Sequence, residues 1–532
     1  MDEIDDPRIR SVVIVGGGTA GWMTAASLVQ HFRNTPLSVT VVESSEIGTI
    51  GVGEATIPTI RRFYAKLGMS DQAVMRATGA TCKLGIRFLD WSAPGSDFIH
   101  PFGHYGQDVG GVGFHHYWMR AKARSEQAPL SAYSLGASLA LADRFVEPSP
   151  NPPSQLSVFD WALHLDASLF AQHLRSYAEA HGCGRIDARI QKVELKSDDG
   201  PMAGHVRALS LADGREVEAD FFIDCSGFGG LVISKALGVG FEDWGQWLPC
   251  DAAFAVQSAN RPDEQPSPFT RVTARNAGWQ WGIPLQHRAG NGLVFSSAHQ
   301  SDDEALSELM PNLMGEALME PRRISFRPGR RRQAWAKNCV AIGLSAGFLE
   351  PLESTSIALI ENGIERLKSL FPDRRFSQPI IDEFNDQSAR EMERVRDFII
   401  AHYKLAGRAD TDFWRDCRAM AVPDTLQRKF DLWKARGQFV RYRWEMFHPA
   451  SWLAIYDGMG LYPDGVDPGA EAMDADYLMR SLKEMRSSIS DLVSRTPHHS
   501  AFLERVAAVA PGTPKTSSPI LAPSAPGARI SA

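Results

Sequence analysis

The sequence predicts a mixed α/β (α+β) fold with a βαβ unit at its start, a sheet-rich insertion and a mostly helical C-terminal region. Three observations support this prediction. A β-branched apolar run near residue 11 is followed by a glycine turn and a stretch with helical character. The middle of the chain alternates apolar and polar residues as strands do. From residue 379 to about residue 500, apolar residues recur at helical spacing.

The βαβ unit is expected over residues 11–43. Ser11–Val15 has the apolar, β-branched character of a buried parallel strand. A helix is expected from Gly21 to about residue 32, and a second strand over Leu37–Glu43. The glycine-rich segment Gly48–Thr59 is expected to be a loop, followed by a helix near Ile60–Leu67.

Strands and helices alternate less regularly across the centre of the chain. Cys82–Trp91 alternates like a strand, and residues 92–160 are expected to be rich in loops. The other expected elements are a helix at about 166–181, strands at Ile186–Val193, His205–Leu211 and Glu216–Cys225, an antiparallel sheet at 270–299, a strand at Val340–Leu344 and a helix at about 354–370. The predicted organisation is a tail (1–10), a core (11–375) with insertions at about 81–160, a helical region (376–510) and a disordered tail (511–532).

The composition limits the classes of protein to consider. The 532 residues are 44% hydrophobic and 22% charged, as in ordinary globular proteins. A formal charge of −7 gives no support to nucleic acid or an anionic membrane as a partner. Six cysteines lie far apart with no CxxC pair, the N-terminus is acidic, and no apolar run is long enough to span a membrane. We therefore expect a reduced, cytoplasmic protein without a metal site.

A dinucleotide fingerprint lies between the first strand and the first helix. Gly16-x-Gly18-x-x-Gly21 provides a tight turn, a close backbone approach to a pyrophosphate and close helix–strand packing, with Thr19 and Ala20 at the start of the helix. Glu43 ends the next strand, where a carboxylate accepts hydrogen bonds from a ribose. The alternative is a structural turn with a surface glutamate. The fingerprint alone does not separate NAD from FAD, but the sheet-rich middle that returns to a strand near residue 340 favours FAD.

Four segments carry a more specific pattern. They are GGGTAGW at 16–22, TCKLGIRFLDW at 81–91, GWQWGIP at 278–284 and SAGFLEPLESTSI at 345–357. Together they resemble the flavin-dependent halogenases of the tryptophan halogenase family, from about residue 10 to about residue 465. The resemblance implies an FAD-binding, Rossmann-like core, with substrate-region segments at about 81–160 and a C-terminal helical region that covers the substrate.

The resemblance also implies a reaction. Reduced FAD, supplied by a separate flavin reductase through contact or diffusion, reacts with oxygen to give a flavin hydroperoxide. Chloride or bromide is oxidised to hypohalous acid, which travels to an electron-rich, indole-like aromatic substrate. The alternatives left open are a flavin aromatic monooxygenase (hydroxylase) and a non-catalytic FAD-binding protein, and a homodimer is compatible with the sequence.

Lys83 and Glu353 match the catalytic pair of the family. A lysine amine can hydrogen-bond hypohalous acid or form a haloamine, and burial tunes its ionisation. A carboxylate can stabilise the cationic ring intermediate and assist its deprotonation. The alternatives are a solvated strand lysine and a helix-capping acid, and Glu350 is the competing carboxylate.

The resemblance assigns further binding residues. The backbone N–H groups of Thr355 and Ser356 match the halide site, at the start of an expected helix. Many members have glycine where this chain has Ser356, which bears on halide affinity and preference. His100 and Phe102 match a substrate-pocket pair, to which Glu353 is added. The flavin contacts implied are Trp279, Trp281, Leu344 and Ile357, with Val193 on the adenine side.

Overall fold

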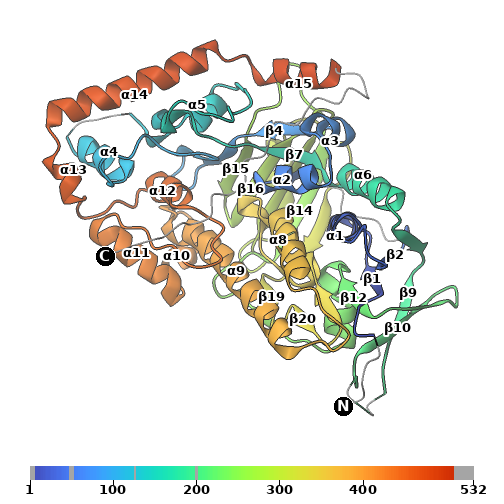
Figure 1. Cartoon of the computed structure of the whole chain (residues 1–532). Helices are drawn as coiled ribbons and strands as arrows, with labels where there is room; N and C mark the ends of the chain where they lie inside the picture. The colour runs from blue at the N-terminus through green and yellow to red at the C-terminus, as the bar shows by residue number, and fades with distance from the viewer. Residues whose placement is uncertain (1–5, 47–52, 125–127, 198–199, 201, 509–532) are drawn as a thin grey trace, which may run out of the picture.

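The computed structural model describes residues 6–46, 53–124, 128–197, 200 and 202–508 (Figure 1). The expected disordered tail (511–532) and part of the loop expected at 48–59 lie outside these residues. Among the described residues, no helix is long and apolar enough to cross a membrane.

A six-stranded sheet holds the predicted βαβ unit. β1 (Ser11–Val15) lies between β2 (Ser38–Glu43) and β12 (Phe221–Asp224), and both pair with it in parallel. α1 (Thr19–His31) connects β1 to β2. The nearly uninterrupted apolar sequence of β1 is explained by burial, since four of its five residues are inaccessible to solvent. The sheet is completed by β8 (Gly184–Asp187), β21 (Cys339–Ala341) and β20 (Trp335–Ala336).

The antiparallel sheet expected at 270–299 is part of a larger one. It has seven strands in the order β18 (Arg322–Ser325), β14 (Ala252–Ser258), β17 (Ala289–Phe295), β16 (Gly278–Pro284), β15 (Thr270–Arg275), β5 (Gly85–Leu89) and β6 (Asp97–Pro101). Three small sheets contain β3 (Gly53–Ala55), β7 (Ala162–Asp166) and β4 (Thr81–Lys83); β11 (Glu216–Glu218), β10 (Val206–Leu211) and β9 (Ile190–Leu195); and β13 (Phe241–Asp243), β19 (Gly329–Arg331) and β22 (Gly347–Phe348).

The single strand predicted at Cys82–Trp91 is wrong, because the segment forms two strands in different sheets. β4 pairs with β7, whereas β5 pairs with β6 and β15. Gly85 permits the change of sheet, since a Cβ there would lie 2.5 Å from the carbonyl oxygen of His100. A single strand would place Lys83 and Arg87 on the same face, but Lys83 is fully buried, while Arg87 is half-buried and paired with Asp97.

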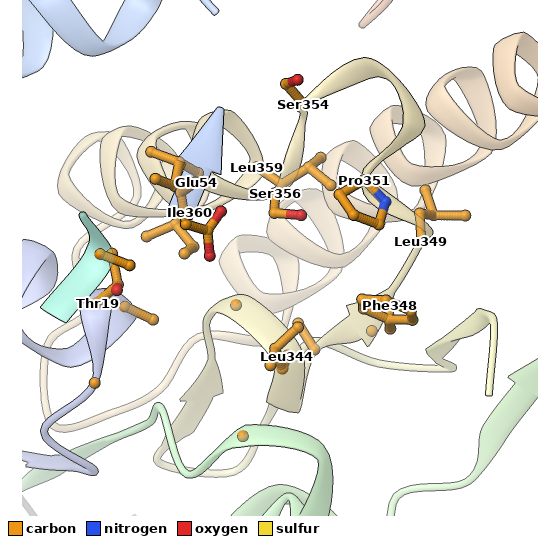
Figure 2. Close-up of a pocket in the computed structure, with 18 of the residues that line it drawn as sticks. Thr19, Glu54, Leu344, Phe348, Leu349, Pro351, Ser354, Ser356, Leu359 and Ile360 are labelled. Atoms are coloured by element: carbon orange, nitrogen blue, oxygen red, sulfur yellow. The ribbon is translucent and has the colours of Figure 1, made fainter. Parts of the chain in front are cut away.

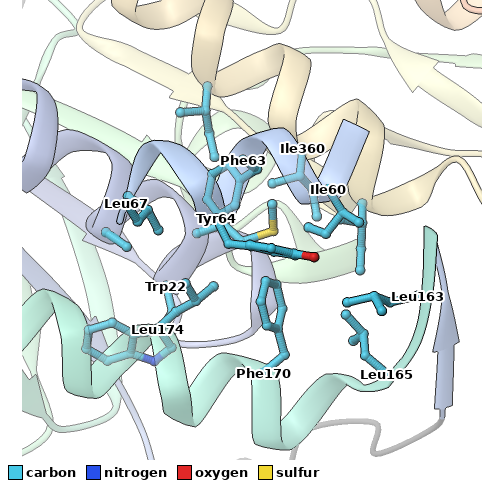
Figure 3. Packing of buried hydrophobic residues seen from close by; sticks show 14 of the residues in the cluster. Trp22, Ile60, Phe63, Tyr64, Leu67, Leu163, Leu165, Phe170, Leu174 and Ile360 are labelled. Carbon is cyan, nitrogen blue, oxygen red and sulfur yellow. The ribbon is translucent and has the colours of Figure 1, made fainter. Parts of the chain in front are cut away.

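Helices pack between and around the sheets. The helices before residue 378 are α2 (Thr59–Lys66), α3 (Asp71–Thr78), α4 (Phe114–Lys122), α5 (Leu135–Leu141), α6 (Ala167–Ala180), α7 (Asp302–Leu309) and α8 (Ser356–Ser369). Figure 3 shows how α1, α2 and α6 share one core, to which they contribute Trp22, Tyr64 and Phe170 respectively. This core fixes the helix that begins at the glycine turn against the sheets.

The C-terminal part of the described chain is helical, as its periodicity indicates. It comprises α9 (Gln378–Leu405), α10 (Asp412–Ala419), α11 (Asp424–Arg436), α12 (Pro449–Gly458), α13 (Pro468–Ala472), α14 (Ala475–Arg495) and α15 (His499–Ala508). The predicted apolar face of α9 is confirmed, because Phe384, Val395, Phe398, Ile399 and Tyr403 are all buried. α14 runs along the outside of α4 and α5, and α15 returns the chain to α3 (Figure 1).

Candidate functional site

A cavity of about 360 Å³ opens between the βαβ unit, the seven-stranded sheet and α8. Figure 2 shows Thr19, Glu54, Leu344 and Ser356 around this space. The lining is mostly apolar, and its elements come from widely separated parts of the chain. Its dimensions and its position next to the glycine turn are those expected of a dinucleotide cleft.

The glycine turn has the geometry that its sequence predicts. Gly16 has a φ of +109°, and a Cβ there would lie 2.5 Å from the carbonyl oxygen of Cys225. A Cβ on Gly21 would lie 1.9 Å from the carbonyl oxygen of Gly16, so the glycine allows α1 to pack on the turn. Gly18 has open space in front of it, and Thr19 and Ala20 line the cavity beside it. The turn thus leaves room for a pyrophosphate at the start of α1.

Glu43 lies directly behind this turn, at the end of β2. Its Oε1 accepts a hydrogen bond from Arg185 Nε at 2.6 Å and its Oε2 one from Trp22 Nε1 at 3.3 Å. A Cβ on Gly17 would overlap the carboxylate, so the backbone of the turn touches it. The carboxylate is therefore fixed against the turn, but it does not line the cavity, and its predicted contact with a ribose stays a prediction.

Four of the predicted flavin contacts line the cavity, and one does not. Trp279 and Trp281 on β16 have ring centroids 6.0 Å apart and line the cavity together with Leu344 and Ile357. Val193 is not among the lining residues, since it lies on β9 against the βαβ sheet. Its predicted contact with the adenine stays a prediction.

Lys83 is fully buried at the end of β4. Its Nζ donates hydrogen bonds to the carbonyl oxygen of Thr56 at 3.0 Å and to Ser354 Oγ at 2.7 Å. Ser354 also lines the cavity, so one hydrogen bond connects the amine to the wall of the cleft. Phe102, a predicted substrate residue, lies over the same amine with its ring centre 5.2 Å from Nζ.

The ionisation of Lys83 is strongly perturbed. Burial lowers its pKa to about 7, and the negative charge of Glu353 opposes the shift only in part. Ammonium and free amine are therefore both populated near neutral pH. An amine with these properties can act as a hydrogen-bond donor and as a nucleophile.

Glu353 is held by two buried histidines. Its Oε2 lies 2.9 Å from His100 Nδ1 and its Oε1 lies 2.8 Å from His402 Nε2. Burial favours the neutral acid, but His100 and His402 outweigh it and lower the pKa of Glu353 to about 2. Since the Nδ1 atom of His402 faces the carbonyl oxygen of Phe398 at 2.8 Å, both ring nitrogens of His402 face acceptors. The ring of His402 is therefore held between two oxygen atoms, and it fixes the orientation of the Glu353 carboxylate.

Glu350, the competing carboxylate, has a different environment. Its Oε2 accepts hydrogen bonds from Trp279 Nε1 at 2.8 Å and Tyr403 OH at 2.5 Å, while its Oε1 has no partner among the described residues. Burial raises the pKa of Glu350 to about 7. The structure therefore links Glu350 to the tryptophan strand and Glu353 to the surroundings of Lys83.

The predicted halide segment lies at the start of α8. Ser356 is the first residue of the helix and lines the cavity. Among the described residues, no acceptor is bonded to the backbone N–H of Thr355 or Ser356. The left-handed residue of this segment is Ser354, with a φ of +60°, and not Ser356. Serine in place of glycine at position 356 consequently imposes no backbone strain.

Sequence reasoning missed three contributors to this region. Ser354 lies inside the quoted motif, but only the fold places its hydroxyl on Lys83. His402 belongs to FIIAHY, a helical segment with no local sign of its contact with Glu353. Glu54 lines the cavity, and burial raises its pKa to about 7. A carboxyl group inside an otherwise glycine-rich and apolar segment was the signal available for Glu54.

An aromatic wall stands beside the Lys83–Glu353 region. Phe398 on α9 stacks on Phe447 at 3.8 Å between ring centroids and meets Trp452 on α12 edge-on at 4.8 Å. His100 packs against Phe398 at 5.9 Å. These side chains are buried against one another in one core cluster, and the predicted contact of His100 with a substrate stays a prediction.

A Rossmann-like βαβ unit that opens on an apolar cavity, with a buried amine one hydrogen bond away from the cavity wall, indicates a dinucleotide-dependent oxidoreductase. The model of the tryptophan halogenase family matches residues 11–475. The chain belongs to this family and is a flavin-dependent halogenase with the FAD-binding fold.

Individual relatives are similar to this chain over most of their length. Tryptophan 6-halogenase SttH of Streptomyces toxytricini is 36% identical over 510 residues, covering 91% of this chain and 96% of that protein. BrvH, a flavin-dependent halogenase from Brevundimonas sp. BAL3, is 76% identical with a TM-score of 0.91, covering 94% of this chain and 100% of that one. Xcc4156, a flavin-dependent halogenase from Xanthomonas campestris, is 43% identical with a TM-score of 0.89, covering 95% and 100%.

Proposed function

We propose that this enzyme uses reduced FAD, oxygen and chloride or bromide to halogenate an electron-rich, indole-like aromatic compound, with Lys83 directing the halogen. The observation that carries the proposal is the position of the Lys83 amine. It is buried, one hydrogen bond from a residue of the cavity wall, and next to the charged Glu353. Bound FAD would supply, with oxygen, the oxidising equivalent that converts halide to hypohalous acid.

The residues of the cleft fit FAD. The open turn at Gly18 and the first amides of α1 would hold the pyrophosphate, and Glu43 the ribose. Trp279, Trp281 and the other apolar lining residues would surround the ring system and exclude water. The unbonded amides of Thr355 and Ser356 would bind halide at the start of α8.

Lys83 would hold hypohalous acid through its third amine position, because two are already used by Thr56 and Ser354. The ammonium would polarise the oxidant by donating a hydrogen bond. The free amine would attack the halogen of hypohalous acid, forming an N–halogen bond as the halogen–oxygen bond breaks and water leaves with one amine proton. A pKa of about 7 makes both forms available. Because the acceptors of Thr56 and Ser354 are fixed, the third position of the amine points in one direction. This would orient the bound oxidant.

Glu353 would act mainly as a fixed negative charge. Attack of the halogen leaves a cationic ring, which a buried carboxylate stabilises. A group with a pKa of about 2 is a weak base, but the cationic ring is a far stronger acid and still transfers its proton. His100 and Phe102 would place the substrate ring between Lys83 and the aromatic wall. The relative SttH is a tryptophan 6-halogenase, and we propose tryptophan or a related indole as the substrate class here.

Replacement of Lys83 by methionine tests the function. With a flavin reductase, NADH, oxygen, bromide and indole, the wild type is expected to give brominated indole, identified by its isotope pattern. Lys83→Met is expected to bind FAD and consume oxygen without forming this product. The surface variant Lys66→Met is the matched control. A hydroxylated product from the wild type, or normal bromination by Lys83→Met, would refute the proposal.

A further inference from the structure

The strand that carries Lys83 is an edge strand with an unusual outer partner. β4 pairs with β7 on one side only, through Thr81–His164, Cys82–Leu163 and Lys83–Ala162. Its outer N–H groups at Cys82 and Leu84 therefore need acceptors from elsewhere. Leu84 donates to the carbonyl oxygen of Pro268 at 2.7 Å.

The N–H of Cys82 is bound by a histidine more than 400 residues later in the sequence. It donates to His499 Nε2 at 3.2 Å, and His499 Nδ1 lies 2.7 Å from the carbonyl oxygen of Pro266. Because Nε2 accepts and Nδ1 faces a carbonyl oxygen, His499 is the neutral tautomer with its proton on Nδ1. Burial supports this form by lowering the pKa of His499 to about 4. The ring thus takes the place of a neighbouring strand.

The helix that carries His499 is itself firmly attached. The backbone N–H of His499 donates to the carbonyl oxygen of Asp143 at 2.9 Å, and Arg144 donates to the carbonyl oxygen of Thr496. Phe502 packs on Phe145 with ring centroids 4.6 Å apart. His499 is 1% exposed, whereas the adjacent His498 is exposed. The chain therefore orients one of two consecutive histidines into the core.

We propose that His499 is a positioning residue for halogen transfer, which fixes the backbone on the N-terminal side of Lys83 and so holds its amine against Ser354 and Thr56. This inference rests on the proposed function of Lys83. Without the hydrogen bond, Cys82 N–H loses its acceptor in a buried site, and the end of β4 relaxes. A displacement of about 1 Å at a reacting group costs on the order of 100-fold in rate.

The test compares product with oxidant for each variant. The product-to-trap ratio is the amount of brominated indole divided by the amount of hypobromous acid that leaves the protein and reacts with a dimedone trap. Both amounts are measured at equal oxygen consumption. His499→Leu, which removes both hydrogen bonds, is expected to lower the product-to-trap ratio about tenfold or more while FAD affinity stays within twofold. His498→Leu, the matched control, is expected to keep the ratio of the wild type.

A second pair of variants distinguishes loss of the hydrogen bond to Cys82 from loss of packing. It also provides the test if His499→Leu does not fold. Gln at position 499 reaches Cys82 N–H, whereas Asn is too short and retains only the contact with Pro266. His499→Gln is expected to restore most of the ratio and His499→Asn is not. Equal ratios for these two variants, or a wild-type ratio in folded His499→Leu, would overturn the inference. Normal bromination by Lys83→Met would instead refute the function of Lys83, so the two failures are distinguishable.

Discussion

Replacing Glu353 by glutamine tests the electrostatic part of the site. The amide has the same shape as the carboxylate, and both its polar atoms can find partners. Its oxygen can accept a hydrogen bond from one of the two histidines, and its NH₂ can donate to a ring nitrogen of the other. Removing the side chain would leave buried polar groups unpaired, at a cost of about 1–3 kcal/mol. Glu353→Gln leaves none unpaired, so we expect it to change the free energy of unfolding at pH 7 by less than this amount.

The effect on the reaction should be much larger than the effect on stability. Removing one preorganised electrostatic group at a developing charge typically costs about 2.7–4 kcal/mol, which is about 10² to 10³ in rate. Glu353→Gln is therefore expected to form brominated product at least about 100-fold more slowly, with unchanged FAD affinity. The assay is the single-turnover rate of product formation, with FAD binding measured by fluorescence. A loss of less than fivefold would show that the charge of Glu353 does not stabilise the reacting ring.

Three further predictions concern other parts of the site. Gly18→Val is expected to weaken FAD binding more than tenfold with little change in the melting temperature, and an unaltered affinity would contradict the assigned cleft. Gly21→Ala is expected to lower the melting temperature, because its Cβ would lie 1.9 Å from the carbonyl oxygen of Gly16. Thermal unfolding and FAD titration distinguish the two effects. The pKa of Glu350 is raised in the folded state, so its contribution to stability decreases as the pH rises from about 4.5 to about 7. In urea unfolding, Glu350→Gln is therefore expected to stabilise the protein more at pH 8 than at pH 5. Equal gains in stability at the two pH values would argue against a buried charge at Glu350. Product formation by the wild type is expected to change with a midpoint near pH 7, and Lys83→Arg, which stays charged, is expected to lack that midpoint in a pH–rate profile.

The local parts of the fold were predictable because short-range chemistry determines them. The turn at Gly16, the burial of β1 and the apolar face of α9 follow from glycine conformation and from periodicity, and each agrees with the structure. The break between β4 and β5 was not predictable in this way. Alternation of side chains is the same whether a strand stays in one sheet or passes into another, and the constraint at Gly85 comes from the distant His100.

The same distinction holds for the site. The resemblance identified Lys83 and Glu353, but nothing in their neighbouring residues indicates which groups surround them. Two histidines from β6 and α9 lower the pKa of Glu353, and a serine with a positive φ binds Lys83. These contacts join residues separated by 49 to 271 positions in the sequence, so only the tertiary structure shows them. The roles of these residues remain predictions until variants are measured.

The positive φ of Ser354 has a practical consequence for redesign. This one residue lets the chain turn between Glu353, which meets the histidines, and the first amides of α8, which face the cleft. The aromatic wall comes instead from α9, α12 and Phe447 just before α12, all outside that turn. Libraries that aim at new substrates can therefore diversify Phe398, Phe447 and Trp452 while keeping residues 351–356 and His402 constant, so that the contacts of Lys83 and Glu353 are the same in every member.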